Sequence, residues 1–190
     1  MRRGYRMRLT AIMGAVCLPF AAARAADQQV PLTPPTTRIG YTVFVMGVLP
    51  ISASFDRFWG IVTEDPAKPA TCGIDVAVDV GSLRMDDPDR RRRTLGPDML
   101  DAARYPTMRF AGHCAPQSIT GTLTLHGISR PVSFATHREG NQVICAGTVR
   151  RRDFGIAGLD ALVAPYVHIR LSVHLPAEKG QSSALDPLGP

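Results

Sequence analysis

The sequence lacks the local signatures of the common enzyme classes. It contains no Gly-x-Ser-x-Gly nucleophile elbow, no His-Glu-x-x-His zinc helix and no paired cysteine cluster. His168 and His174 share the polar face of one expected strand. Six residues span roughly 20 Å along a strand, which is too far for both imidazoles to bind one metal ion. We therefore expect a protein that is not an enzyme and has no metal site.

The N-terminal apolar run is too short for a transmembrane helix. It extends from Leu9 to Ala23 without a charge, whereas a spanning helix needs about 20 apolar residues. Arginines at positions 2, 3, 6 and 8 precede the run, and Ala23-Arg24-Ala25 follows with small residues where a signal peptidase cuts. We expect residues 1–25 to be a cleaved signal peptide and the mature protein to be periplasmic.

A basic excess, which nucleic-acid binding would require, is absent from the expected mature chain. The full sequence has 22 lysines and arginines against 16 aspartates and glutamates. Residues 1–25 hold five of the arginines and no acidic residue, so 17 basic residues remain against 16 acidic ones. Nucleic acid is therefore not an expected partner.

Cysteines are few, and their spacing matches no zinc-binding pattern. Cys72, Cys114 and Cys145 remain after signal cleavage, and two of them can pair in an oxidising compartment. We expect the pair Cys72–Cys114, because both residues flank an expected hairpin. Cys114–Cys145 is the alternative.

Alternation of apolar and polar residues dominates the rest of the chain. It is clearest in Ile74–Val80 and Val167–Leu175, where every second residue is apolar. Weaker alternation occurs in Ile39–Met46, Ile51–Phe58, Met108–Gly112, Gly121–Leu125, Pro131–Thr136 and Val143–Val149. About eight strands with short connections predict an all-β fold, a single antiparallel β-barrel, since closure removes exposed sheet edges.

The alternation also gives the expected domain boundaries. Residues 26–37 form a Pro-rich spacer, residues 38–176 form the barrel and residues 177–190 form a flexible tail. Residues 86–105 interrupt the alternation, so we expect an irregular segment with a short helix that crosses an end of the sheet.

Five strings resemble the motifs of the YceI family, in the family's order along the chain. They are Phe55-Asp56-Arg57-Phe58-Trp59-Gly60, Val78-Asp79-Val80-Gly81-Ser82-Leu83, Tyr105-Pro106-Thr107-Met108-Arg109-Phe110, the segment from Gly121 through His126-Gly127 to Val132, and Arg152-Asp153-Phe154-Gly155-Ile156. The resemblance covers Ile39 to Leu175. It implies an exported, lipocalin-like barrel that binds a polyisoprenoid lipid.

Inward-facing apolar residues are the candidate ligand contacts. They are Val43, Val45, Phe55, Phe58, Val76, Val78, Met108, Phe110, Leu123, Leu125, Phe134, Ile169 and Leu171. A dry packed core has the same pattern, and it is the family resemblance that favours a cavity. Trp59, Met99 and Leu100 are candidates for the cavity mouth.

Four consecutive arginines, Arg90, Arg91, Arg92 and Arg93, form the most concentrated charge run. They either belong to a solvated loop, partly neutralised by nearby aspartates, or bind the anionic headgroup of a lipid. The second interpretation adds a membrane surface to the expected partners. A homodimer is left open.

These features together predict a periplasmic carrier of an isoprenoid-type lipid, either a polyprenyl chain or a quinone, which is the only bound cofactor that we expect. The alternative is a stress-related structural or protein-interaction barrel with a filled core and no ligand.

Overall fold

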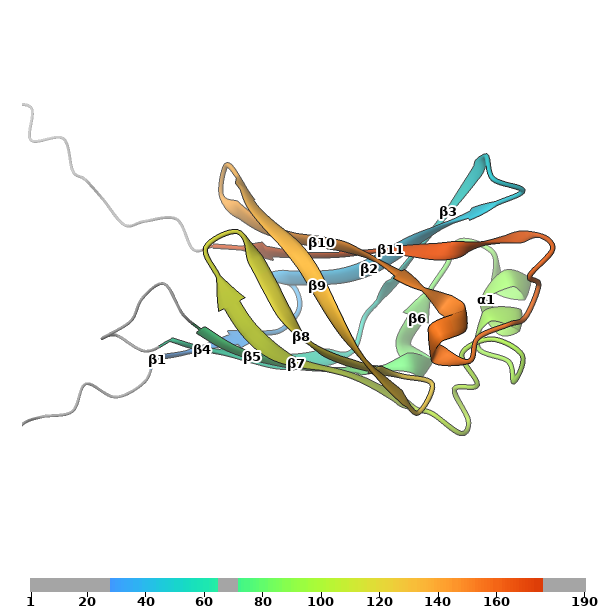
Figure 1. Ribbon diagram of the computed structural model, residues 1–190, viewed down its shortest axis with the longest axis horizontal. Coiled ribbons are helices and arrows are strands. Elements are labelled where there is room, and N and C mark those ends of the chain that lie inside the picture. The colour runs from blue at the N-terminus through green and yellow to red at the C-terminus, as the bar shows by residue number, and fades with distance from the viewer. Residues whose placement is uncertain (1–27, 65–71, 176–190) are drawn as a thin grey trace, which may run out of the picture.

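The alternating segments form the strands of one antiparallel sheet, which curls into a lipocalin-like barrel (Figure 1). The computed structural model describes residues 28–64 and 72–175, so the expected signal peptide and the expected tail at 177–190 lie outside the described residues. The strands follow the order β1-β4-β5-β7-β8-β9-β10-β11-β2-β3-β6. The prediction of an all-β, lipocalin-like antiparallel fold is confirmed.

Eleven strands, one α-helix and two 3-10 turns make up the described parts of the chain. The strands are β1 (Gln28–Leu32), β2 (Thr37–Val45), β3 (Leu49–Phe55), β4 (Phe58–Glu64), β5 (Cys72–Asp79), β6 (Leu83–Arg84), β7 (Thr107–Ala115), β8 (Ser118–Leu125), β9 (Ile128–Glu139), β10 (Gln142–Arg150) and β11 (Val163–His174). The helical elements are η1 (Val80–Ser82), α1 (Pro88–Thr94) and η2 (Arg151–Phe154).

Part of the expected spacer at 26–37 is instead ordered sheet. Residues 28–32 form β1, which pairs with β4, and Leu32 is almost completely buried in the core. Pro31 lies within this strand opposite Ile61. A proline is tolerated there because β1 is at the edge of the sheet, where one side of the strand needs no ladder hydrogen bonds.

Three strands, β1, β4 and β6, are additional to the expected eight. β1 continues into β2 through a tight turn, and β3 continues into β4 through Asp56 and Arg57. At the second corner the Asp79 carboxylate accepts hydrogen bonds from Arg57 Nε and from the Gly81 backbone N–H, both at 2.8 Å. The expected strand Ile51–Phe58 therefore ends at this corner, and only its last residue, Phe58, belongs to β4, which pairs with β5 and not with β2.

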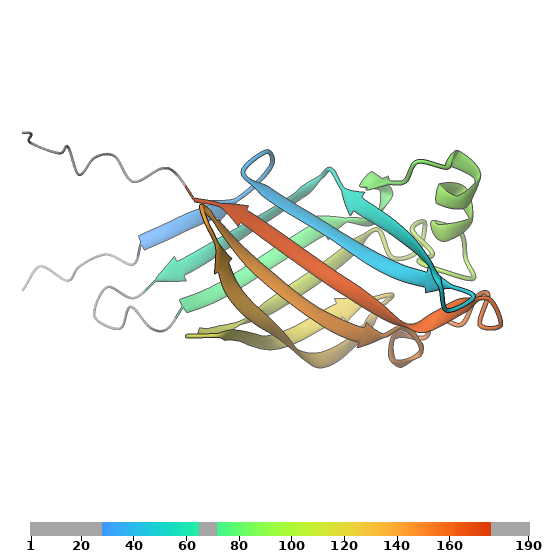
Figure 2. The same cartoon turned by 90° about the horizontal axis from the view of Figure 1, so that it is seen from above.

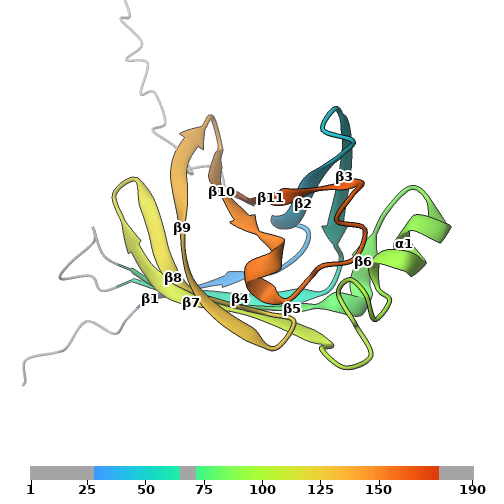
Figure 3. The same ribbon diagram turned by 45° about the vertical axis from the view of Figure 1, so that its right-hand side comes forward.

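The irregular segment at 86–105 contains α1 at one end of the barrel, as Figure 3 shows. Asp87 caps the helix, since its carboxylate accepts the N–H groups of Asp89 and Arg90, and Pro88 occupies the first turn. The helix and the turns that follow it separate β6 from β7. This end of the molecule also holds the β2–β3 hairpin tip and the segment between η2 and β11 (Figure 2).

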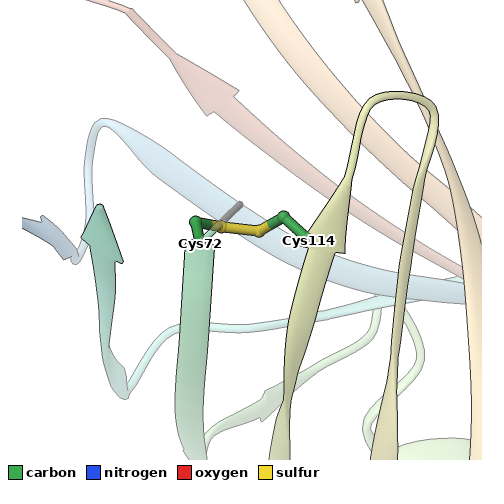
Figure 4. Close-up of a disulfide and its surroundings, with 2 residues drawn as sticks. All are labelled: Cys72 and Cys114. Atoms are coloured by element: carbon green, nitrogen blue, oxygen red, sulfur yellow. A yellow bond between two sulfur atoms is a disulfide. The ribbon is translucent and has the colours of Figure 1, made fainter. Parts of the chain in front are cut away.

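A disulfide joins Cys72 to Cys114, as predicted (Figure 4). The two residues are directly opposite in the β5–β7 ladder, with Cα atoms 4.9 Å apart. Cys145 is a free, buried cysteine on β10.

Replacing Cys72 and Cys114 together by serine should lower the free energy of unfolding by about 4 kcal/mol, because the bond closes a loop of 42 residues in the unfolded chain. Urea unfolding of the oxidised protein and of the double variant measures this difference. A Cys145→Ser variant is the control for loss of a thiol, and equal midpoints for the oxidised protein and the double variant would contradict the prediction.

Candidate ligand cavity

The curled sheet forms the wall of a cavity of about 500 Å³ that is partly open to solvent. This volume lies in the range of small-molecule sites, about 300–1,000 Å³. Its wall is overwhelmingly apolar, and its lining residues come from strands along the whole sheet, from β5 and β7 through β10 and β11 to β2 and β3. The sheet therefore surrounds an apolar space that its own side chains do not fill.

Strand register explains why the wall is apolar. On β2 the residues Ile39, Tyr41, Val43 and Val45 alternate with residues that face outward, and all four line the cavity. On β11 their partners are Leu171, Ile169, Val167 and Val163, which also line it. Because paired residues in an antiparallel ladder share one face, each strand pair contributes stacked apolar layers to the interior.

Twelve of the thirteen candidate ligand contacts lie on the cavity wall. They are Val43, Val45, Phe55, Val76, Val78, Met108, Phe110, Leu123, Leu125, Phe134, Ile169 and Leu171. Phe58 does not line the cavity. It is buried in the packed core, directly after the β3–β4 corner. Ligand contact by the other twelve stays a prediction.

The cavity mouth differs in part from the expectation. Met99 and Leu100 line the cavity, but Trp59 does not, and its side chain is 57% exposed. Phe58 on β4 is buried, so its neighbour Trp59 faces the opposite side of the sheet. The expectation that Trp59 lines the mouth was wrong.

The four consecutive arginines have different environments. Arg90 and Arg93 line the cavity at the α1 end. Arg91 donates hydrogen bonds to the backbone carbonyls of Leu83 and Gly81, at 2.7 and 2.8 Å. Arg92 forms an exposed ion pair with Asp89. Arg90 and Arg93 are thus the two candidates for headgroup contact at the cavity, whereas Arg91 attaches the helix to the barrel.

Arg151 is a buried arginine that sequence patterns did not indicate. It donates to the backbone carbonyls of Ile156, Gly158, Val163 and Ala164 at 2.8 to 3.2 Å. It also forms an ion pair with Asp160. One side chain thereby holds the segment between η2 and β11, which carries the mouth residues Leu159 and Leu162.

Two further polar groups, Tyr41 and Cys145, lie on the wall, although Cys145 was a candidate only for a disulfide and Tyr41 was not a candidate. Both lie within expected strands, and extending the alternation from Val43 would have found Tyr41. Burial raises the pKa of the Cys145 thiol to about 11. Since the thiolate is the reactive form, Cys145 is a poor nucleophile at neutral pH.

His126 has a structural environment at the β8–β9 turn. Its Nδ1 lies 3.2 Å from the Phe154 carbonyl oxygen, and its ring packs on Tyr105 with centroids 4.5 Å apart. His126 and Gly127 have φ values of 53° and 73°, which a tight hairpin turn requires. His126 thus joins the turn to η2.

Within residues 28–64 and 72–175, His, Cys, Asp and Glu side chains form no group of three that could hold a metal ion. The helices in the same ranges are all too short or too polar to cross a membrane.

Comparisons with known proteins point to one family. The family model described as a YceI-like domain matches residues 31–175. A UPF0312 protein of Vibrio cholerae is 30% identical over 181 residues, which cover 87% of this chain and 93% of that protein. A UPF0312 protein of Pseudomonas putida is 27% identical over 162 residues, with 77% and 84% covered.

Solved structures share the fold. BcnA of Burkholderia cenocepacia superposes with a TM-score of 0.62 at 23% identity, covering 72% of this chain and 94% of BcnA. A polyisoprenoid binding domain from Saccharophagus degradans gives a TM-score of 0.55 at 13% identity, with 78% and 100% covered. The YceI protein of Campylobacter jejuni gives 0.55 at 20% identity, with 65% and 82% covered.

Proposed function

Because the chain belongs to the YceI family, we propose that it is a periplasmic carrier of an isoprenoid-type lipid, held in the barrel, and not an enzyme. The observation that carries the proposal is the apolar cavity of about 500 Å³. Enclosing a slender hydrocarbon chain there removes apolar surface from water, which is favourable at about 25 cal/mol per Å². The polyisoprenoid binding domain from Saccharophagus degradans, which shares the fold, supports a polyisoprenoid ligand.

The alternative, a structural or protein-interaction barrel with a filled core, is less consistent with this interior. Protein cores pack as densely as organic crystals, with few voids larger than a water molecule. A cavity of about 500 Å³ exceeds such voids by an order of magnitude. An unfilled apolar interior of this size favours a ligand.

Apolar side chains around the mouth suggest how the lipid enters. At the β2–β3 hairpin tip, Met46 is 75% exposed, Val48 80% and Leu49 55%. Leu159 and Leu162 extend the exposed apolar set, and Leu49, Leu159 and Leu162 also line the cavity. These five residues are called the mouth rim. The β2–β3 hairpin tip and the segment between η2 and β11, which carry them, lie at the α1 end of the barrel (Figures 1 and 2). We propose that it contacts the membrane surface and gives the lipid an apolar path.

Replacing Met46 and Val48 together by serine should slow lipid uptake from vesicles about tenfold while leaving the equilibrium affinity for a soluble short-chain isoprenoid unchanged. Neither residue lines the cavity, and their exposure means that folding does not depend on them. Stopped-flow transfer of a fluorescent isoprenoid from phosphatidylglycerol vesicles to delipidated protein measures the rate.

The matched control is Trp59→Ser with Ile61→Ser, which removes exposed apolar residues of β4 that lie away from the cavity lining. Equal uptake rates for the rim variant and the wild-type protein would overturn the proposed membrane contact. A control variant that is as slow as the rim variant would overturn it too.

A further inference from the structure

The cavity wall holds one hydroxyl to which no described residue is hydrogen-bonded, whereas the free Cys145 thiol on the same wall is only a weak donor. Among the described residues, the Tyr41 hydroxyl forms no hydrogen bond with another protein group, although the residue lies on the inner face of β2. Buried tyrosine hydroxyls normally have a partner. In the described residues, two side-chain polar atoms have neither a hydrogen-bond partner nor exposed surface, namely Thr37 Oγ1 and His126 Nε2. Tyr41 Oη is not one of them. Its oxygen therefore still reaches open space, and the space that its side chain lines is the cavity.

The other polar groups on the wall are occupied or lie at the mouth. Arg151 is bound to four carbonyls and to Asp160. Arg109 pairs with Asp75, and the Thr94 hydroxyl donates to the Arg90 carbonyl at 2.9 Å. Arg90 and Arg93 are exposed on α1. Asp87 and Asp89 also line this end of the cavity, where Asp87 caps α1 and pairs with Arg90 at 3.7 Å and Asp89 pairs with Arg92.

Tyr41 lies deeper in the barrel than these arginines. Val45 is at the mouth end of β2. Tyr41 is four positions before it, which corresponds to about 13 Å along the strand. In the ladder Tyr41 faces Ile169, which faces Gly147 on β10. A Cβ at Gly147 would lie 2.6 Å from the Phe134 ring, so this layer has no room for another side chain there.

Its surroundings keep Tyr41 a donor. The ring of Phe55 lies 6.1 Å away, between centroids, and burial raises the pKa of the Tyr41 phenol to about 12. The hydroxyl thus carries its proton at every physiological pH. An apolar site of this kind disfavours a desolvated anion but accepts a neutral carbonyl oxygen.

We propose that Tyr41 binds a neutral acceptor oxygen of the lipid inside the barrel, so that the protein selects an isoprenoid with a carbonyl-bearing head, such as a quinone, over a plain polyprenyl hydrocarbon. This inference rests on the proposed carrier function. The head lies in the Tyr41 layer, and the chain follows the apolar wall. A charged diphosphate head would lose its hydration in this apolar layer without a compensating partner, which is unfavourable. Such a head would instead lie beside Arg90 and Arg93 at the mouth.

The test compares wild-type protein, Tyr41→Phe and an Arg90→Gln, Arg93→Gln double variant, each against three probes. The probes are a short-chain isoprenoid benzoquinone, a polyprenyl hydrocarbon of the same chain length and the corresponding polyprenyl diphosphate. Affinities come from calorimetry on delipidated protein. Tyr41→Phe removes one oxygen and keeps the ring, so packing of the wall is preserved.

The proposal expects Tyr41→Phe to weaken quinone binding three- to tenfold, in keeping with one neutral hydrogen bond, and to leave hydrocarbon and diphosphate binding unchanged. The double arginine variant should weaken only the diphosphate. Unchanged quinone affinity in Tyr41→Phe, or an equal loss for quinone and hydrocarbon, overturns the role of Tyr41. If wild-type protein binds none of the three probes, the carrier function itself is wrong and this inference falls with it.

Discussion

Replacing Val167 by tryptophan should reduce lipid affinity by about 10- to 100-fold while leaving the barrel folded. Val167 is half-buried on the inner face of β11, opposite Val43, and lines the cavity. An indole ring at this position occupies space that the lipid chain would use. If the lipid still binds, the cavity is overpacked, and overpacking of a protein interior costs about 1–3 kcal/mol. In the absence of ligand the extra atoms enter an existing void, so the stability of the fold should change little.

Tyr166→Trp is the matched control, since Tyr166 is the preceding residue on β11 and its side chain is 53% exposed. Fluorescence titration with a short-chain isoprenoid compares the two variants at the same tryptophan content. Wild-type affinity in Val167→Trp, with an unchanged circular dichroism spectrum, would show that the lipid does not bind in the barrel.

Replacing Arg151 by methionine should lower the free energy of unfolding by about 3–5 kcal/mol. The guanidinium has almost no exposed surface and serves four backbone carbonyls and Asp160. Methionine keeps most of the apolar stem but has no donor, so these acceptors lose their partner in a buried place, and removal of one member of a buried ion pair typically costs this much. Denaturant unfolding measures the change.

Arg152→Met provides the comparison, because Arg152 also pairs with Asp160 but is 56% exposed. An exposed pair contributes less than about 1 kcal/mol, so this variant should unfold close to the wild-type midpoint. If Arg151→Met and Arg152→Met lose equal stability, Arg151 does not hold the segment between η2 and β11 in the way that its hydrogen bonds indicate.

The strands of the barrel wall could be predicted because the period of two in the sequence is also the geometry of a strand. Val76 and Val78 on β5, and Ile169 and Leu171 on β11, are apolar at every second position, and all four line the cavity. The expected strands also allowed Cys72 and Cys114 to be paired, because both flank an expected hairpin. In the structure the two cysteines are opposite each other in the β5–β7 ladder.

The corners and the buried polar groups could not be predicted in this way. Asp79 bends the β3–β4 corner through hydrogen bonds to Arg57 and Gly81, which no periodicity encodes. Arg151 reads as a surface residue in an arginine-rich stretch, and only the carbonyls of a segment up to 13 residues away make its burial favourable. Leu32 lies in a Pro-rich sequence, and its burial depends on pairing with β4 far along the chain.

Native mass spectrometry of the protein purified from its own cell envelope, followed by organic extraction, tests the central claim most directly. The account predicts one bound lipid per chain that survives gentle ionisation, and an extract that contains an isoprenoid with a carbonyl-bearing head. In Val167→Trp, purified in the same way, the fraction of protein with bound lipid should be lower. A bare protein mass for the wild-type chain, with no isoprenoid in the extract, would contradict the account.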